Sequence, residues 1–317
     1  MPLDHYISQV YLRNFYSPKL GKLMYAIRKS DLRAFTPDAK SVCRIEDGST
    51  NAYLKKNRLV EEFLKEIEPK FNKALAHLQD DNIDSECIYV MAGFIAYVLS
   101  CSPASMRIQS EPLRGLVEET TRLLDSSGSF PPPPPELGGK SLTELIQKKE
   151  VLIDIDGKFP QALAIANILC LTKLFGNFKW EILINPFKDS PFFTSDFPIA
   201  IEKTATPGLL NRIVPLSPSV AVRIRADRSI DEERVDFTFS RFQRSRRNLS
   251  LSKVASINKL IVRCAETTVF FRDNHDWVRK FIKKNANYRI EPEVMKIPLA
   301  RGNALWSVQY ISEIKGD

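Results

Sequence analysis

Hydrophobic residues in the first half of the chain recur at the spacing of amphipathic helices. From Asn51 to about Leu78, apolar side chains return every three to five residues, a pattern that is typical of a helix with one buried face. Over Glu86–Cys101 nearly every side chain is apolar, which indicates a helix in the middle of a bundle. Further helices are expected over residues 112–124, from residue 141, and over residues 161–175.

After Trp180 the pattern changes to short apolar runs that are separated by turn residues. These runs predict strands at Glu181–Asn185, Phe192–Thr194, Ile199–Glu202, Arg212–Pro215 and Val220–Ile224. Short strands that follow one another through tight turns favour an antiparallel sheet. Near the N-terminus, Lys22–Arg28 is expected to be a strand in a hairpin with residues 4–15. Towards the C-terminus we expect a helix over Ala255–Thr267, a strand over Val269–Phe271, and a helix capped by Asn274.

Together these elements predict a single α+β domain over residues 1–317, with a mainly antiparallel sheet packed against a helical bundle. The helical section covers residues 51–175, and the sheet-forming section combines residues 4–28 with residues 178–310. Within residues 126–140, serines, glycines and five consecutive prolines predict an extended linker. We interpret this linker as a surface insertion that joins helices; a proline-rich ligand for a partner domain is the alternative.

The composition is that of a globular protein with an excess of basic residues. The formal net charge is +8, which favours nucleic acid or an anionic surface as a partner. One stretch gathers arginines around Phe242, namely Arg241, Arg244, Arg246 and Arg247. Such a cluster is suited to bind phosphates and to stack a base, although charge on an exposed helix or loop is the alternative. The preceding acidic run is Asp231–Glu233.

The spacing of the cysteines and the N-terminal sequence indicate where in the cell the protein is expected. The five cysteines are far apart and form no C-x-x-C pair, so reduced thiols are expected and a zinc site of the finger type is not. The N-terminus has no basic and apolar regions of a signal peptide, and the most apolar helix is too short to span a bilayer. We therefore expect a cytoplasmic protein with no membrane partner.

Polar side chains in an apolar setting indicate a candidate site at Thr194, Ser195 and Asp196. They follow two phenylalanines and precede Phe197-Pro198. A carboxylate between buried strands needs hydrogen-bond donors, a cation, or a cleft to face. We interpret the stretch as facing a cleft.

A second set of polar residues lies near the N-terminus. His5, Gln9 and Arg13 are four residues apart, so they share one face on either a helix or a strand. Glu61 and Glu68 are two helical turns apart on a later helix. A solvated polar face is the alternative for both sets.

Four motifs occur in one order along the chain: His5–Phe15, the acidic helix with Glu61 and Glu68, Thr194–Pro198, and Pro215–Pro218. In this the sequence resembles domain-of-unknown-function family 4238 from residue 5 to about residue 286. It departs from the family pattern at Ser8, where proline is frequent, and at Phe197, where asparagine is usual. The resemblance implies a prokaryotic cytosolic protein of a family found near mobile elements and defence genes, and implies no assigned reaction. It also implies that one pocket is shared by His5, Gln9, Arg13, Glu61, Glu68, Thr194, Ser195, Asp196 and Asn258.

These residue types suit the cleavage of phosphodiesters. His5 has the chemistry of a general base or acid, and Arg13 can hold a phosphate bidentately. Asp196 can orient the imidazole, or bind a divalent metal such as Mg²⁺ together with Glu61 or Glu68. Ser195 lacks the glycine-flanked elbow of a nucleophile, and no glycine-rich phosphate loop of an NTPase is present.

The sequence therefore supports two hypotheses. The first is a nuclease or toxin-like phosphodiesterase that acts on nucleic acid, as an effector of prokaryotic anti-phage defence, with a regulatory protein partner left open. The second is a non-catalytic sensor or binding module of a defence or mobile-element system, in which His5, Arg13 and Asp196 form a buried polar network. The first requires His5 and Asp196 to lie in one pocket.

Overall fold

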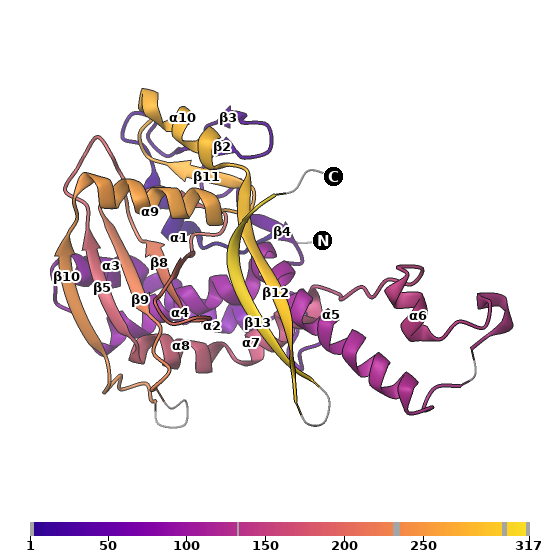
Figure 1. Cartoon of the computed structure of the whole chain (residues 1–317). Helices are drawn as coiled ribbons and strands as arrows, with labels where there is room; N and C mark the ends of the chain where they lie inside the picture. The colour runs from indigo at the N-terminus through magenta and orange to yellow at the C-terminus, as the bar shows by residue number, and fades with distance from the viewer. Residues whose placement is uncertain (1–2, 132, 231–234, 300–302, 315–317) are drawn as a thin grey trace.

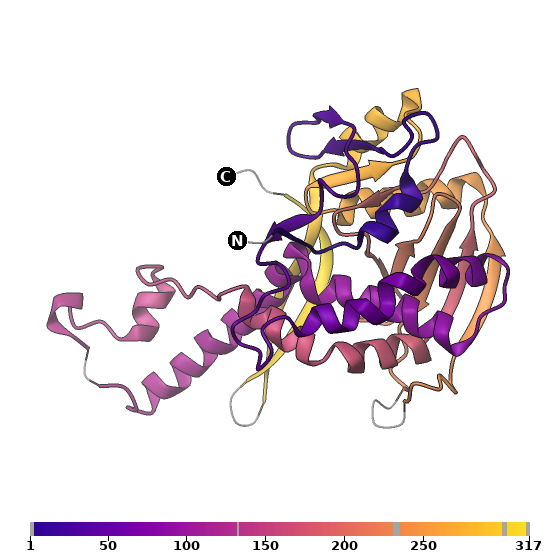
Figure 2. The same cartoon turned by 180° about the vertical axis from the view of Figure 1, so that it is seen from behind.

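A computed structural model describes residues 3–131, 133–230, 235–299 and 303–314. The fold is α+β, as the sequence predicts: mainly antiparallel sheets pack against a layer of helices (Figures 1 and 2). The acidic run Asp231–Glu233 and Pro132 of the proline stretch lie outside the described residues.

The helical layer is centred on α4 (Ser85–Cys101), which is buried nearly all round. The helices and short 3-10 turns around it are α2 (Leu59–Ile67), η2 (Glu68–Lys70), α3 (Phe71–Gln79), α5 (Pro103–Ser126), α7 (Lys158–Ala166) and α8 (Ile168–Asn177). The expected helix over residues 51–78 is broken into α2 and α3 at Pro69, whose ring removes a backbone N–H from the ladder. Ser102 separates α4 from α5, and its hydroxyl accepts a hydrogen bond from the Ser105 amide.

The second half of α5 projects from the body of the molecule and carries the predicted linker at its end (Figures 1 and 2). Pro112 lies inside this helix rather than before it. The chain continues through η3 (Pro135–Leu137) and α6 (Leu142–Gln147). Ser141 and Glu144 form the capping box that the sequence predicts for the start of α6.

Most of the predicted strands after Trp180 form one sheet, which within the described residues has the order β10-β5-β9-β8-β7. Its strands are β5 (Lys179–Ile184), β7 (Ala200–Lys203), β8 (Leu210–Pro215), β9 (Val220–Arg225) and β10 (Gln243–Asn248). All pairings are antiparallel except that of β10 with β5. The sequence did not indicate β10, because all six of its residues are exposed and none is an apolar β-former.

Another sheet has the order β3-β2-β11-β6 in the described chain. It consists of β2 (Tyr25–Arg28), β3 (Ala34–Phe35), β6 (Thr194–Ser195) and β11 (Thr268–Phe271). The predicted hairpin between Lys22–Arg28 and residues 4–15 is wrong. Strand β2 pairs with β3 and β11, whereas β1 (Leu3–His5) pairs with β4 (Arg44–Glu46). The N-terminal segment cannot form a long strand, because it turns into α1 (Gln9–Leu12) and η1 (Arg13–Phe15), which bury Tyr11, Leu12 and Phe15.

The C-terminal part adds α9 (Leu251–Cys264), α10 (Asp276–Asn285) and a long hairpin of β12 (Tyr288–Pro298) and β13 (Asn303–Glu313). Helix α10 has His275 at its N-cap position, without a side-chain cap, so the prediction that Asn274 caps it is wrong. Figure 1 shows the hairpin lying across the front of the molecule beside α5. The sequence indicated only a surface tail with one last strand there.

The five cysteines are unpaired. Within the described chain, no single helix has the length and apolar character needed to cross a bilayer, and the bent pairs α4–α5 and α7–α8 have them only when each pair is joined.

Candidate active site

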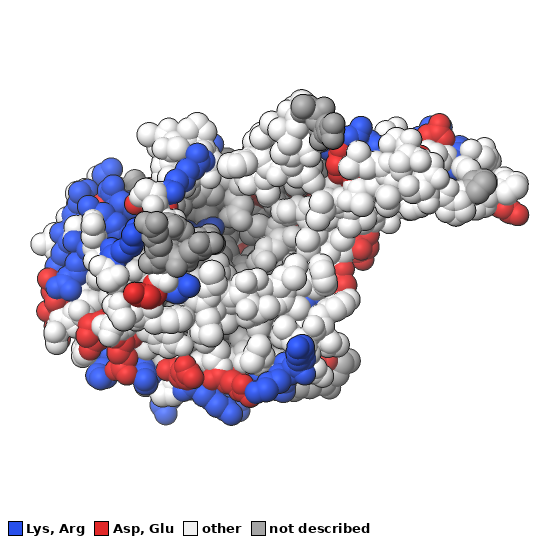
Figure 3. All heavy atoms as spheres, turned by 90° about the horizontal axis from the view of Figure 1, so that it is seen from below, with Lys and Arg blue, Asp and Glu red and all other residues white. Residues whose placement is uncertain are grey.

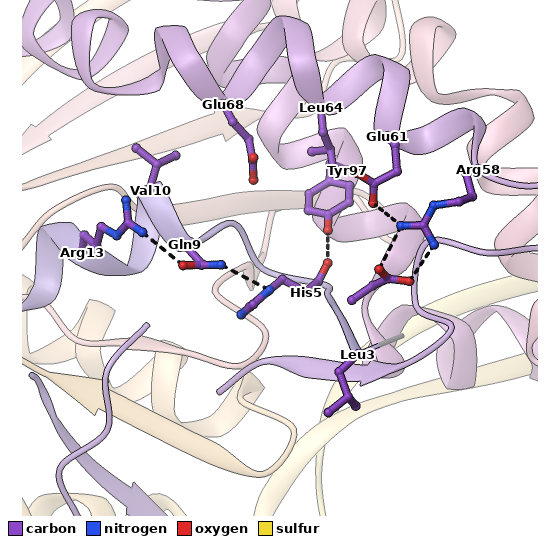
Figure 4. Close-up of a pocket in the computed structure, with 11 residues that line it drawn as sticks. Leu3, His5, Gln9, Val10, Arg13, Arg58, Glu61, Leu64, Glu68 and Tyr97 are labelled. Carbon is purple, nitrogen blue, oxygen red and sulfur yellow. Dashed lines mark hydrogen bonds and ion pairs between the residues drawn. The ribbon is translucent and has the colours of Figure 1, made fainter. Parts of the chain in front are cut away.

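A pocket of about 370 Å³ lies between the N-terminal segment and helices α2 and α4 (Figure 4). Polar side chains from both sides converge on it. Its lining is Leu3, Asp4, His5, Gln9, Val10, Arg13, Arg58, Glu61, Leu64, Glu68 and Tyr97. The pocket thus brings together five of the residues that the sequence indicates: His5, Gln9, Arg13, Glu61 and Glu68.

His5 is held at the end of β1 by contacts on both its backbone and its ring. Its Nε2 lies 3.1 Å from the carbonyl oxygen of Lys40, and its own carbonyl accepts a hydrogen bond from the Tyr97 hydroxyl. Because a carbonyl only accepts, Nε2 carries the proton of the neutral ring. The lone pair of that ring is therefore on Nδ1, which faces Gln9.

Gln9 and Arg13 continue this arrangement along the first helical turns. An Nη atom of Arg13 donates to Oε1 of Gln9 at 3.1 Å, which leaves the Gln9 amide nitrogen directed at Nδ1 of His5, 3.5 Å away. The order of the three residues follows from their spacing, since Gln9 and Arg13 are one helical turn apart. The cation, the amide and the imidazole form one polarised chain along the edge of the pocket (Figure 4).

The opposite end of the pocket is an ion-pair cluster that orders the start of α2. The Arg58 guanidinium donates to both carboxylate oxygens of Asp4, at 2.9 and 3.3 Å, and to Glu61 at 3.3 Å. Burial disfavours the charge on Asp4, but Arg58 and the Ser49 amide outweigh burial and hold the pKa of Asp4 below its usual value. This cluster engages Glu61 and leaves it little freedom to bind a ligand.

Glu68 differs from the other acidic residues of the pocket. It makes no hydrogen bond and no ion pair with any side chain in the part of the chain that the structure describes. Figure 4 shows its carboxylate pointing into the pocket, on the side where Gln9 lies. Glu68 is therefore the carboxylate available to a bound group.

Asp196 is not part of this pocket, and the expectation that it faces a cleft is wrong. It is only 4% exposed. One carboxylate oxygen accepts from the Glu266 amide at 3.0 Å, and the other accepts from the Thr267 amide at 2.8 Å, the Thr268 amide at 3.2 Å and the Thr267 hydroxyl. Burial raises the pKa of Asp196, while these donors and the charge of Lys29 oppose that rise. Donors satisfy this carboxylate, so it needs no cleft.

The polar residues near Asp196 also form hydrogen bonds with other buried groups of the protein. The side-chain oxygen of Thr194 hydrogen-bonds with the Tyr11 hydroxyl, and Oγ of Ser195 accepts from the Phe197 amide at 3.2 Å. Asn258 accepts from the Phe193 amide and donates to the Pro191 carbonyl, both at 2.9 Å. All three are buried. Thr194, Ser195, Asp196 and Asn258 fix strand β6 to its surroundings and do not line the pocket.

The proposed metal ligands Glu61, Glu68 and Asp196 do not fit a Mg²⁺ site. Asp196 is absent from the pocket lining, and Glu61 is paired with Arg58. Among the residues that the structure describes, no three or more His, Cys, Asp or Glu side chains gather as a metal site requires. We therefore derive no step through a metal ion.

Three arginines of the cluster, Arg244, Arg246 and Arg247, lie on the edge strand β10, and Arg241 precedes it. Arg244 pairs with Asp81 at 3.1 Å, and Arg246 donates to the carbonyls of Leu78 and Gln79 at 3.0 and 2.7 Å. Arg246 thus caps the end of α3, and Arg244 contacts the turn that follows this helix. Phe242 packs edge-on against Trp180, with ring centroids 5.4 Å apart, so its ring is not free to stack a base. Arg241 and Arg247 are exposed.

Comparison with known proteins gives one family. The family model described as "Protein of unknown function (DUF4238)" matches residues 4–275. The chain belongs to this family. No curated protein and no solved structure matches it significantly. The matched range of this family member contains the whole pocket except Leu3.

Sequence reasoning missed three residues that bring polar groups to the pocket in this member of the family: Asp4, Arg58 and Tyr97. Asp4 and Arg58 meet from positions 54 residues apart, and no local pattern indicates that pairing. Tyr97 was visible only as one more large residue of the apolar helix. Its hydroxyl was the available signal, because a buried tyrosine usually finds a hydrogen-bond partner.

Proposed function

We propose that this protein is a cytoplasmic nuclease that cleaves RNA without a metal ion, using the 2′-hydroxyl of the substrate as the nucleophile. The sequence hypothesis required His5 and Asp196 to lie in one pocket, and that version of the active site is wrong, because Asp196 is buried outside the pocket. The observation that carries the present proposal is the pocket itself, in which Glu68 is the available carboxylate. It combines an imidazole with its lone pair turned inward, the Arg13 guanidinium at its edge, and the unpaired carboxylate of Glu68. These are the groups that metal-free phosphodiester cleavage needs.

In the proposed step, the Gln9 amide turns from Nδ1 of His5 to the bound phosphate, and Nδ1 then accepts the proton of a 2′-hydroxyl. The freed oxygen forms a bond to the adjacent phosphorus, and the bond from phosphorus to the 5′-oxygen breaks. The leaving oxygen takes a proton from water, and His5 later returns its proton to solvent. The products are a 2′,3′-cyclic phosphate and a 5′-hydroxyl end.

The neighbours of His5 have defined tasks in this step. The Gln9 amide and the Arg13 guanidinium donate to the non-bridging phosphate oxygens and offset the charge that builds on them. Glu68 stabilises the imidazolium cation that His5 becomes. The net charge of +8 favours a polyanionic substrate, and the exposed Arg241 and Arg247 offer further cations for its phosphates.

The test uses a short RNA and its DNA counterpart, incubated with the purified protein in EDTA. We expect RNA cleavage with 2′,3′-cyclic phosphate ends by mass spectrometry, and none when the residue at the cleavage position is 2′-deoxy. His5→Ala is expected to lower the rate by about 100-fold or more. His77→Ala is the matched control, because His77 lies on α3 and contacts Asp84 instead of the pocket. Intact RNA under all conditions, or equal rates for His5→Ala and wild type, would falsify the proposal.

A second candidate is a non-catalytic binding module. It is favoured by the ion-pair cluster of Asp4, Arg58 and Glu61, which fixes the N-terminal segment to α2 without need of a ligand. It predicts RNA binding that His5→Ala weakens, with no cleavage by wild type.

The proposed role in anti-phage defence is tested by plaque counts on cells that carry wild type or His5→Ala. A regulatory partner is tested by whether cleavage requires phage infection.

A further inference from the structure

Two adjoining cavities lie on another side of the molecule, between α8, the sheet and the β12–β13 hairpin. Their volumes are about 320 and 350 Å³, and they share Leu171, Phe175, Arg212 and Gln309. No residue of the His5 pocket lines either of them. Figure 3 shows the molecule hollowed when it is viewed from below, with the blue of a basic side chain inside the recess. The size is that of pockets that hold small organic ligands.

Arg212 lies where the strand pattern calls for an apolar residue. It alternates with Leu210 and Val214 on β8, so these three side chains share one face of the sheet. Its partners across the neighbouring strands are Ile201 on β7 and Ile224 on β9. Helix α8 lies over this apolar face of the sheet, and the guanidinium of Arg212 is therefore placed among apolar side chains.

The guanidinium of Arg212 makes no hydrogen bond and no ion pair with any described residue. Arg223, on the opposite face of the same sheet, shows the usual solution: it pairs with Glu181 and with Glu202 at 3.0 Å. Arg212 is half-buried in the wall shared by both cavities. Because its guanidinium has no anionic partner there, an anion that enters the cavities would supply the missing negative charge.

Gln309 on β13 is the second polar group common to both cavities. Its side-chain amide also makes no hydrogen bond with the described part of the chain. The rest of the shared lining is apolar, with Leu171 and Phe175 from α8. One guanidinium and one amide offer donors for two oxygen atoms, which matches a carboxylate better than a phosphate dianion.

We propose that these cavities bind an amphipathic carboxylate, such as a medium-chain fatty acid. Its carboxylate accepts hydrogen bonds from Arg212 and Gln309, and its hydrocarbon part lies against Leu171 and Phe175. The site is separate from the proposed catalytic pocket, and the inference does not depend on RNA cleavage.

The test is calorimetric titration of the full chain with decanoate, 1-decanol and decyltrimethylammonium. Wild type is expected to bind decanoate at least tenfold more tightly than either of the other two. Arg212→Met is expected to weaken decanoate binding at least tenfold and to leave 1-decanol binding unchanged. Arg33→Met is the control for lost net charge, because Arg33 is exposed in the loop between β2 and β3. No binding of decanoate by wild type, or equal binding by Arg212→Met, overturns the proposal.

Thermal unfolding gives an independent readout. Arg212→Met is expected to raise Tm in the absence of ligand, because it replaces an unpartnered cation with an apolar side chain of similar length. It is also expected to abolish the rise in Tm that decanoate gives in wild type. A lower Tm for the ligand-free variant would mean that Arg212 has structural partners, and would overturn the proposal. If Arg212→Met does not fold, Leu171→Trp narrows the cavity without touching the cation and must still abolish decanoate binding.

Discussion

The carboxylate of Asp196, the residue directly after β6, accepts a hydrogen bond from the backbone N–H of Thr267 at 2.8 Å. The adjacent amides of Glu266 and Thr268 donate to the same carboxylate, at 3.0 and 3.2 Å. Three successive backbone donors are thus satisfied by one side chain, directly before and at the start of β11. This places Asp196 among the residues that hold the β3-β2-β11-β6 sheet together, and outside the proposed chemistry.

Asp196→Asn is therefore expected to lower stability rather than the rate per folded molecule. An amide offers one acceptor oxygen, and its NH₂ group would face backbone donors. We expect the free energy of unfolding to fall by about 2–4 kcal/mol, measured by urea denaturation. Asp80→Asn, at an exposed position after α3, is expected to stay within about 0.5 kcal/mol. Full stability with lost RNA cleavage in Asp196→Asn would contradict this assignment.

Acid is expected to loosen the β12–β13 hairpin from α5. The Glu119 carboxylate on α5 pairs with Arg122, with Lys296 at 2.7 Å and with Asn303 at 2.8 Å. Arg122 first, and then Lys296 and Asn303, lower the pKa of Glu119 from 4.5 to about 2. Because the pKa is lower in the folded state, the stabilisation is complete above pH 4.5 and is lost as the pH falls towards 2.

The measurement is amide hydrogen exchange in the hairpin, expressed as protection factors between pH 6 and pH 3. Protection is expected to fall in wild type and to change much less in Glu119→Gln, which cannot ionise. An equal fall in both proteins would show that other groups anchor the hairpin.

Tyr97 is expected to act as a positioning residue for His5. Its hydroxyl donates to the His5 carbonyl, and burial raises the pKa of Tyr97, which keeps that donor protonated. If the protein cleaves RNA as proposed, Tyr97→Phe should lower kcat about tenfold and leave KM within about twofold. Tyr89→Phe is the matched control, because Tyr89 lies on the same helix and donates to Glu66 at 3.0 Å, outside the pocket. Equal kcat values for the two variants would mean that His5 holds its place without Tyr97.

Two arginines of β10 are expected to have different roles, one in stability and one in RNA binding. Arg246 caps the carbonyls of α3, so Arg246→Ala is expected to lose about 1 kcal/mol of stability. Arg247 is exposed, and Arg247→Ala should retain stability while the slope of log Kobs against log salt for RNA binding drops by about 1. Filter binding at several salt concentrations measures the slope. An unchanged slope would remove β10 from the RNA path.

Helix α4 and strand β10 show what the sequence could and could not indicate. Residues 86–101 are so uniformly apolar that the expected helix differs from Ser85–Cys101 by one residue. Strand β10 is exposed throughout and joins the sheet only by pairing with β5. That pairing depends on backbone groups, which are the same for every residue type, and no side-chain pattern marks it.

The candidate site also contains residues that the sequence could indicate and residues that it could not. Helical spacing was sufficient for Gln9 and Arg13, and for the acidic face of α2 and η2, because neighbours along a helix are fixed by its period. Asp196 looked functional, because its donors are backbone amides 70 to 72 positions later in the chain. A buried carboxylate that backbone groups satisfy and one that faces a ligand have the same sequence signature.

The sheet that contains β2 and β11 has a consequence for how the protein is made. Lys29, which follows β2, donates to the carbonyl of Ala265, a residue 236 positions later. At about 5–20 residues per second, a ribosome needs on the order of ten to fifty seconds to add that length. Throughout this time strands β2 and β3 are present on the nascent chain, but β11, which pairs with β2, has not yet been synthesised. A chaperone that shields residues 25–35 during synthesis would therefore limit the pairing of these open strand edges with other chains.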